Sequence, residues 1–591
     1  MSVQTPYENE FVTHLNRYTT VSSEHEAAFD EFISQSNWDD DLRIETQTKE
    51  FVLRNFLGNS PVSIILTGNA GDGKTYICRK VIEEVTGWSS VDWKDLVGDV
   101  DLPHVGRRLR VIKDLSELGE DAGRQQLEDL QSSYTAPESN TVFLIAANEG
   151  RLRALLVQNG MSELYKEVDR QLRDGDNLEP NKKLIVINLN DATTSSYIEQ
   201  TLDWITDESH WEICSQCPAF HHCPIRHNAE KLSNPYVMQR VKLLYQIIEQ
   251  LDDHATIRDM LIHLAYVTTG GLRCQDVISK RSQKDWQDQL HLYVYYENVW
   301  GISASSVFRS KVSVINFVMR LDVGESSVFE IDDFIINGDA YPHTNTAHKQ
   351  LFAEELDLNW KMFRQDRDAY VRSGTASPNA DIQYPIMDWL PHCRRKLFFE
   401  WDRTSFTNRL FPFLFVDQYF GLLEQESSIE REKASRSIVL GLNRAFSGLF
   451  LNDDRSLFIT SQYAHAVEQP VPIVQFSIPR DYIDLEVVPQ NTVFVDRNMA
   501  TLELVIPPPP KVRQVTALRW PINLLMFEYL MRRANGSTSN ILASECELEI
   551  RQLKDALLST FGSQSESNTV AFFAAEDNRY QLRKIQIEKK H

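Results

Sequence analysis

The sequence contains no uninterrupted apolar run of the roughly 18 residues that a membrane-spanning helix requires. Its richest apolar stretch, residues 410–423, is interrupted by Asp417 and Gln418 and is more simply explained as a buried core element. The N-terminus also lacks the basic start and following apolar run of a secretion signal. We therefore expect a cytoplasmic protein that makes no contact with a membrane.

Cysteine and positive charge are scarce as well. Seven cysteines in 591 residues, three of them crowded together, favour reduced thiols and a metal site over a disulfide scaffold. The 61 lysines and arginines are outnumbered by 84 acidic residues, which gives a formal net charge of −23. A protein that neutralises many phosphates by itself usually presents a basic face, so this balance argues against a sole DNA binder. DNA contact through a local basic groove or through a partner protein stays open.

Signatures of several enzyme classes are missing. The sequence has no G-x-S-x-G nucleophile motif, no H-E-x-x-H metalloprotease motif and no nuclease signature. What is there is an ordinary globular composition, with 42% hydrophobic and 25% charged residues, in a chain too long for one hydrophobic core. The length predicts roughly three to five domains.

From residue 63 to about residue 190, short apolar stretches alternate with helical ones. This alternation is typical of an α/β fold with a parallel sheet and helices on both faces. The expected strands are residues 62–67, 109–113, 141–147 and 183–189.

A glycine-rich segment directly follows the first expected strand and opens a helix at residues 76–85. It matches the pattern G-x-x-x-x-G-K-[ST] and consists of Gly68, Asn69, Ala70, Gly71, Asp72, Gly73, Lys74 and Thr75. The glycines let backbone N–H groups turn toward phosphate oxygens, and the helix N-terminus adds its positive dipole end. Lys74 would contact the β- and γ-phosphates, and Thr75 would bind Mg²⁺. The segment therefore predicts an ATP site.

Hydrolysis also needs a further magnesium ligand and a group that activates water. Asp114, just after the second expected strand, is the candidate ligand, and nearby Glu117 is the candidate base. The third expected strand ends in Asn148 and Glu149. We place this strand between the carboxylate strand and the phosphate loop, so that Asn148 would orient the γ-phosphate or the attacking water, with Glu149 as a reserve base. The simpler alternative is that Asp114 and Glu117 only cap a helix.

This order of elements resembles the AAA+ class of P-loop ATPases, which implies an AAA+-like core with a helical lid. In that class Asn148 would match sensor 1, and Arg170 or Arg173 would be offered to a neighbouring subunit. Arg258 lies where a lid helix offers sensor 2. An arginine at any of these positions would stabilise the charge that develops on the transferred phosphoryl group. The simpler alternative is that each of the three is an ordinary arginine on the solvated surface. An arginine acting across a subunit boundary implies a homo-oligomer.

A cysteine cluster follows the expected sheet region. It has the spacing C-x₂-C-x₅-C-x₃-H and consists of Cys214, Cys217, Cys223 and His227. Tetrahedral Zn²⁺ takes thiolate and imidazole ligands, and the first pair has half-site spacing. Rivals of His227 as fourth ligand are His221, His222 and the more distant Cys274. We expect a structural zinc site between core and lid; an iron–sulfur cluster and reduced core cysteines are the alternatives.

The rest of the chain carries no readable motif. Apolar alternation predicts strands at 473–478, 482–488, 492–496 and 501–506, and the C-terminus predicts helices at 522–533 and 543–560 and strands at 569–574 and 580–587. We therefore divide the chain into an N-terminal helical region (1–60), a P-loop ATPase core (61–210), a Cys-rich insert (211–230), a helical lid (231–280), a mixed helix-rich domain (281–455), a β-rich segment (456–510) and a C-terminal helical, winged-helix-like module (511–591).

Five short motifs occur in one order along the chain. They are Leu-Thr-Gly-Asn-Ala-Gly-Asp-Gly-Lys-Thr (66–75), Lys-Asp-Leu-Ser-Glu-Leu (113–118), Ala-Ala-Asn-Glu-Gly (146–150), Asn-Leu-Asn (188–190) and Cys-x₂-Cys-x₅-Cys-Pro (214–224). Together they resemble the DptF (also DndF) family, the ATPase component of bacterial DNA phosphorothioation-dependent restriction systems. The resemblance covers roughly residues 60–280.

This resemblance implies a protein that works beside DNA-binding or nuclease subunits of a restriction complex. Its ATP turnover would license attack on foreign DNA that lacks the host's sulfur mark, and contact with DNA would be shared with a basic partner. The alternative is a nucleotide-dependent regulator or scaffold of another defence system, with little turnover of its own.

Overall fold

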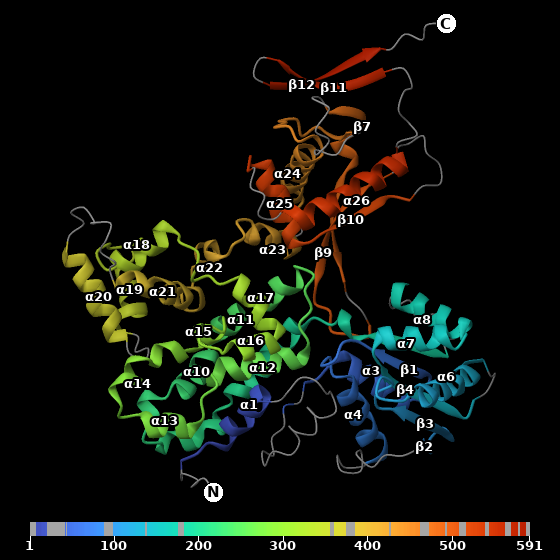
Figure 1. Cartoon of the computed structure of the whole chain (residues 1–591), viewed down its shortest axis with the longest axis horizontal. Coiled ribbons are helices and arrows are strands. Elements are labelled where there is room, and N and C mark those ends of the chain that lie inside the picture. The colour runs from blue at the N-terminus through green and yellow to red at the C-terminus, as the bar shows by residue number, and fades with distance from the viewer. Residues whose placement is uncertain are drawn as a thin grey trace. The chain divides into compact units, whose positions relative to one another are not determined.

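The computed structural model describes residues 7–20, 42, 44–87, 99–135, 139–174, 183–354, 360–373, 385–424, 427–460, 472–490, 493–507, 516–537, 543–561, 569–576 and 579–586. The chain divides into two compact units (Figure 1). Unit 1 contains Met1–Glu249, Asp253–Leu410 and Asn491–Asn498, and unit 2 contains Gln250–Asp252, Phe411–Gln490 and Met499–His591. Among the described residues, no helix combines the length and apolarity needed to span a bilayer.

A five-stranded sheet lies at the centre of the first part of unit 1. Its strands are β1 (Ser63–Thr67), β2 (Asp99–Leu102), β3 (Arg107–Ile112), β4 (Thr141–Ala147) and β5 (Leu184–Asn188). The spatial order is β2-β3-β4-β1-β5, with β3, β4, β1 and β5 parallel and β2 antiparallel to β3. The four expected parallel strands are therefore confirmed, whereas the edge strand β2 is not predicted by the sequence.

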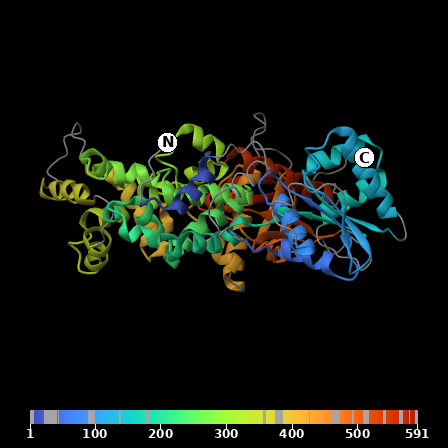
Figure 2. The same ribbon diagram turned by 90° about the horizontal axis from the view of Figure 1, so that it is seen from below.

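Successive residues of β1 point to opposite faces of this sheet and so separate two hydrophobic cores. Ile64 and Leu66 pack with the helices α3 and α4, and Ile65 packs with α6, α7 and α8. Figure 2 shows these two sets, blue and cyan, on opposite sides of the sheet. All of β1 is buried, as expected for a central parallel strand. The helices are α3 (Gln47–Leu57), α4 (Lys74–Thr86), α6 (Glu120–Thr135), α7 (Glu149–Gln158) and α8 (Ser162–Asp174).

The rest of unit 1 is helical. Its longer helices are α1 (Glu10–Thr20), α9 (Ile198–Thr206), α10 (Pro224–Leu232), α11 (Pro235–Glu249), α12 (Ile257–Thr269), α13 (Cys274–Lys280), α17 (Ser313–Arg320), α18 (Phe329–Asn337), α20 (Trp360–Ser373) and α21 (Ile386–Glu400). Shorter turns include η1 (Leu189–Asp191), η2 (Thr194–Tyr197), η3 (Glu208–Gln216) and η4 (Phe220–His222). Residues 231–280, expected to be helical, contain α11, α12 and α13, and Gly270 ends α12 in the left-handed conformation (φ 59°).

A segment from much later in the chain completes the sheet core. Phe494 and Val495 are buried in the same core as Ile64, and the main-chain oxygen of Phe494 accepts a hydrogen bond from the Thr48 hydroxyl (2.6 Å). The carboxylate of Asp496 accepts from Tyr197 Oη (2.9 Å). The expected strand at 492–496 is therefore wrong over its described part, 493–496, because these residues pack against helices instead of pairing with a strand.

The described part of unit 2 contains two antiparallel sheets and four α-helices. One sheet has the order β10-β9-β8 and the other β12-β11-β7-β6, so the strands expected at 473–478, 482–488 and 501–506 are divided between two sheets. The elements are α23 (Val416–Glu424), α24 (Ser428–Ser447), β6 (Ser456–Thr460), β7 (Ile473–Pro479), β8 (Asp484–Pro489), β9 (Ala500–Ile506), β10 (Leu518–Ile522), α25 (Leu524–Ala534), α26 (Ala543–Phe561), β11 (Thr569–Glu576) and β12 (Arg579–Gln586). The close approach of α24 and α25 requires Gly441, since a Cβ there would lie 2.4 Å from the Leu530 carbonyl oxygen.

Candidate functional site

The glycine-rich loop, residues 68–75, connects the carboxyl end of β1 to the start of α4. Its three glycines all have positive φ: 148° at Gly68, 104° at Gly71 and 88° at Gly73. Side chains are strained in these conformations, so the glycine spacing produces this turn. The loop therefore presents backbone groups at the N-terminus of α4, where the helix dipole favours an anion.

Lys74 and Thr75 are the first two residues of α4. Lys74 is only 2% exposed, and its ammonium donates hydrogen bonds to the carbonyl oxygens of Gly68 (3.1 Å) and Asn69 (2.7 Å). The Thr75 hydroxyl donates to the carbonyl oxygen of Lys113, just after β3 (3.4 Å). Both side chains are thus positioned at the loop by backbone oxygens, while Asn69 and Ala70 are exposed.

Asp72 is the acidic member of the loop and is 5% exposed. One carboxylate oxygen accepts from the Asn69 backbone N–H (2.6 Å), and the other is bonded to His254 Nε2 (2.9 Å). Burial lowers the pKa of His254, but the hydrogen bond and charge of Asp72, with further acidic neighbours, raise it more, so its pKa lies above the ordinary value. His254 is a residue that sequence reasoning misses, because it lies far from the loop along the chain.

The start of α12 closes over the same loop. The backbone N–H of Arg258 donates to the Gly71 carbonyl oxygen (3.1 Å). A Cβ at Gly71 would lie 2.8 Å from Thr256 Oγ1 and 3.0 Å from Arg258 Cβ, so only glycine fits. Arg258, a candidate from the sequence, is 7% exposed and lies beside the glycine-rich loop.

Asn190 also lies beside the loop, although it is not part of the glycine-rich motif. Its side-chain oxygen accepts from the Asn69 backbone N–H (2.8 Å). Asn190 follows β5, the neighbour of β1. A polar residue just after a parallel strand is the signal that could have indicated it, since the carboxyl ends of such strands meet at one edge.

Asp114 and Asn148 follow the two strands on the other side of β1. Strand β4 lies between β3 and β1, so the placement expected for the Asn148 strand is confirmed. Half-buried Asp114 accepts from the Ser116 backbone N–H (2.7 Å), and exposed Asn148 caps α7 by accepting from the Arg151 backbone N–H (3.3 Å). Glu117 is exposed one turn beyond Asp114.

Glu149 and the two candidate arginines of α8 are held in ion pairs. Glu149 binds Arg153 (2.8 Å), Arg170 binds Glu167 (2.8 Å) and Arg173 binds Asp169 (2.9 Å). Glu167 and Asp169 also lie on α8, so each of the two arginines forms its ion pair within its own helix and not with the glycine-rich loop.

The clustered thiols, Cys214, Cys217, Cys223 and Cys274, come from three elements of unit 1. Cys214 lies in η3, Cys217 ends it, Cys223 precedes α10, and Cys274 begins α13; all are free. Burial raises the pKa of Cys223 and of Cys274 to about 12, and in each case the charge of neighbouring cysteines adds to the rise. Within the described ranges, no three His, Cys, Asp or Glu side chains adopt metal-binding geometry.

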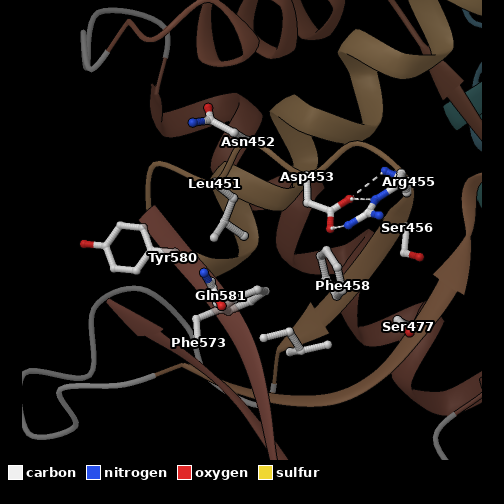
Figure 3. Close-up of a pocket in the computed structure, with 11 residues that line it drawn as sticks. Leu451, Asn452, Asp453, Arg455, Ser456, Phe458, Ser477, Phe573, Tyr580 and Gln581 are labelled. Atoms are coloured by element: carbon white, nitrogen blue, oxygen red, sulfur yellow. Dashed lines mark hydrogen bonds and ion pairs between the residues drawn. The ribbon is translucent and has the colours of Figure 1, made fainter. Parts of the chain in front are cut away.

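A hollow of about 600 Å³ in unit 2 lies between the loop after α24 and the hairpin β11–β12 (Figure 3). Its polar edge is the ion pair of Asp453 with Arg455 (2.8 Å), and Phe458 and Phe573 meet edge to face in its wall. These charged groups bind each other instead of converging on the space. We therefore place the candidate site at the glycine-rich loop.

Comparison of the chain with protein-family models, with curated proteins and with solved structures finds no match.

Proposed function

We propose that this chain is an ATPase with an AAA+-like P-loop core, which binds ATP and Mg²⁺ at the glycine-rich loop. The observation that carries the proposal is the loop itself: three glycines of positive φ lead from a central parallel strand into a helix that begins with Lys74 and Thr75. Backbone N–H groups, an ammonium group and a helix N-terminus together suit a polyphosphate.

The neighbouring residues support hydrolysis as well as binding. Magnesium would be held by Thr75 and Asp114, with Glu117 the proposed base and Asn148 orienting the attacked phosphate or the water. When bound, the metal would neutralise charge on the phosphates. Arg258 lies on α12 and would stabilise the charge that develops on the transferred phosphoryl group. Its backbone N–H already contacts Gly71. Arg170 would have to leave Glu167 to act in a neighbouring subunit.

We further propose that this ATPase is a subunit of a bacterial DNA-restriction complex that depends on DNA phosphorothioation. Its ATP turnover would be coupled to the action of DNA-binding or nuclease partners. The support is the five-motif resemblance to the DptF family together with the net charge of −23, which suits a subunit that leaves most DNA contact to other proteins. The alternative is a nucleotide-dependent regulator with little turnover. It is favoured by the position of Glu117, the proposed base, which is exposed and does not directly follow Asp114.

ATP hydrolysis by the purified full chain, with and without duplex DNA, tests the proposal. Lys74→Ala should lower turnover by about 100-fold, because it removes the cation that contacts the transferred phosphate. Lys80→Ala is the matched control, since Lys80 lies on the same helix and pairs with Glu83 (2.8 Å), and should change turnover by less than about twofold.

Different outcomes separate the two functions. Turnover that rises with DNA and disappears in Lys74→Ala supports the ATPase of a DNA-acting complex. Tight ATP binding with no turnover, with or without DNA, supports the regulator. Failure to bind ATP would overturn both.

A further inference from the structure

The clustered thiols are brought together by folding, although Cys274 lies far from the other three in sequence. We propose that these four thiols bind one structural zinc ion and that Cys274, not His227, is the fourth ligand. Four thiolates satisfy tetrahedral zinc completely, which is the arrangement of structural sites that keep no position open for water.

Asn9, at the start of the chain's first described helix, links two of the thiols. It is 2% exposed, and its amide nitrogen donates to Cys214 Sγ (3.4 Å) as well as to the His210 carbonyl oxygen (2.9 Å). Its backbone N–H donates to Cys274. A buried residue that donates to two sulfur atoms from separate elements is the outer-sphere support that holds metal ligands in place.

Cys223 has donors of its own. It immediately precedes α10, and the backbone N–H groups of Ile225 and Arg226 donate to its sulfur. Donors of this kind stabilise the thiolate form that zinc requires. Cys214 and Cys217 are held in one tight turn, because the Cys217 backbone N–H donates to the Cys214 carbonyl oxygen (3.0 Å).

Within the described residues the four thiols do not have metal-binding geometry, so zinc binding would have to draw them onto a common centre. Binding would form four zinc–sulfur bonds and release four thiol protons to water, with no change in oxidation state. The metal would then fasten η3, α10 and α13 to the start of α1, which is also tied to this region by the bond from Asn16 to the Leu272 carbonyl oxygen (2.9 Å). This inference does not depend on ATP binding.

Metal content of the full chain, purified without chelator and freed of loose ions, is the test. We expect about one zinc per chain, retained in His227→Ala and lost by at least roughly tenfold in Cys274→Ser. Asn9→Ala should keep the ligands but weaken zinc affinity by about tenfold. The matched control is Cys546→Ser, a buried cysteine of unit 2 that should leave zinc unchanged.

A measurement on the unaltered chain covers the case in which Cys274→Ser does not fold. Cobalt substituted for zinc should give strong thiolate-to-cobalt charge-transfer absorption and the visible bands of a tetrahedral ion. Alkylation followed by mass spectrometry should find the four clustered thiols protected until a chelator is added. Absence of zinc, bound iron and sulfide instead, zinc loss in His227→Ala with retention in Cys274→Ser, or alkylation of Cys274 in the metal-loaded chain would each overturn the proposal.

Discussion

Two buried lysines of unit 1 are held by different kinds of group. The Lys74 ammonium, in the glycine-rich loop, donates to the backbone carbonyls of Gly68 and Asn69. The Lys396 ammonium, in α21, donates to the carboxylate of Glu400 one turn away (2.6 Å). A carboxylate neutralises a buried cation, whereas a carbonyl only solvates it. Burial of a lysine therefore does not indicate function; the nature of its acceptors does.

The surroundings of Lys396 extend this contrast. The next residue, Arg395, donates to both oxygens of Asp322 (2.9 and 2.6 Å) and to Glu297 (2.8 Å), and the side chains of all three are almost completely buried. Charges in α21 are thus matched within the fold. At the glycine-rich loop, by comparison, the acceptors of Lys74 belong to a turn whose residues Asn69 and Ala70 face solvent and can rearrange around a ligand.

The largest expected effect is on stability at α21. Lys396→Met should lower the free energy of unfolding of unit 1 by about 3 kcal/mol, because it leaves the buried Glu400 carboxylate without its nearest cation. Lys74→Met should cost only about 1 kcal/mol, since it releases no charged partner: it frees the buried Gly68 carbonyl and the Asn69 carbonyl, and Asn69 is exposed to water. Urea denaturation followed by tryptophan fluorescence measures both. Equal losses in the two variants would show that both lysines are structural and would contradict the distinction between carbonyl and carboxylate acceptors.

A smaller effect is expected at the loop backbone. Gly71→Ala should destabilise unit 1 by about 2 kcal/mol and weaken ATP binding, because φ is 104° there and the new Cβ would meet Thr256 and Arg258. Gly87→Ala is the control: Gly87 also has positive φ (71°), but nothing lies within 4 Å of its Cβ position. That variant should lose about 1 kcal/mol, with ATP affinity unchanged. Calorimetric unfolding and nucleotide titration measure the pair, and equal effects on ATP affinity would refute the packing argument.

The smallest expected effect is a pH dependence at the loop that α21 should not share. The pKa of His254 is raised above its ordinary value, so its bond with Asp72 stabilises the fold fully below about pH 6.5 and loses that contribution as pH rises through the raised pKa. Asp72, Asp259 and Glu249 are the acidic groups that act on it. The stability difference between the unaltered chain and His254→Asn should therefore shrink between pH 6 and pH 9.

Thermal unfolding at a series of pH values measures this effect. The corresponding difference for Arg395→Met should stay constant over the same range, because the raised pKa of Arg395 keeps its guanidinium charged throughout. A constant difference for His254→Asn would show that folding does not raise the pKa of His254.

Local patterns made the sheet and the loop predictable. The strands around β1 are short and uniformly apolar, and the glycine spacing sets the turn that precedes α4. The contacts of His254 and Thr256 with the loop were not predictable, because both depend on how distant segments pack, whereas the position of Asn190 just after a parallel strand could have indicated its contact. The edge strand β2 was missed because its sequence, Asp-Val-Asp-Leu, is short and half polar. The strand expected at 492–496 failed because alternating apolar residues suit a groove against α3 as well as a sheet.

The segment Asn491–Asn498 has a consequence for the order in which the protein is made. The core under β1 is complete only when Phe494 and Val495 have joined it, and the Asp496 carboxylate accepts from the first backbone N–H of α3, that of Gln47 (2.9 Å). A nascent chain on the ribosome exposes the apolar core residues of α3, such as Phe56, until the chain has been translated through Asp496, which lies 449 residues after Gln47. Packing of the core beside the glycine-rich loop is thus delayed until residues 411–490 of unit 2 have left the ribosome, and a messenger that ends before Phe494 cannot yield a fully packed unit 1.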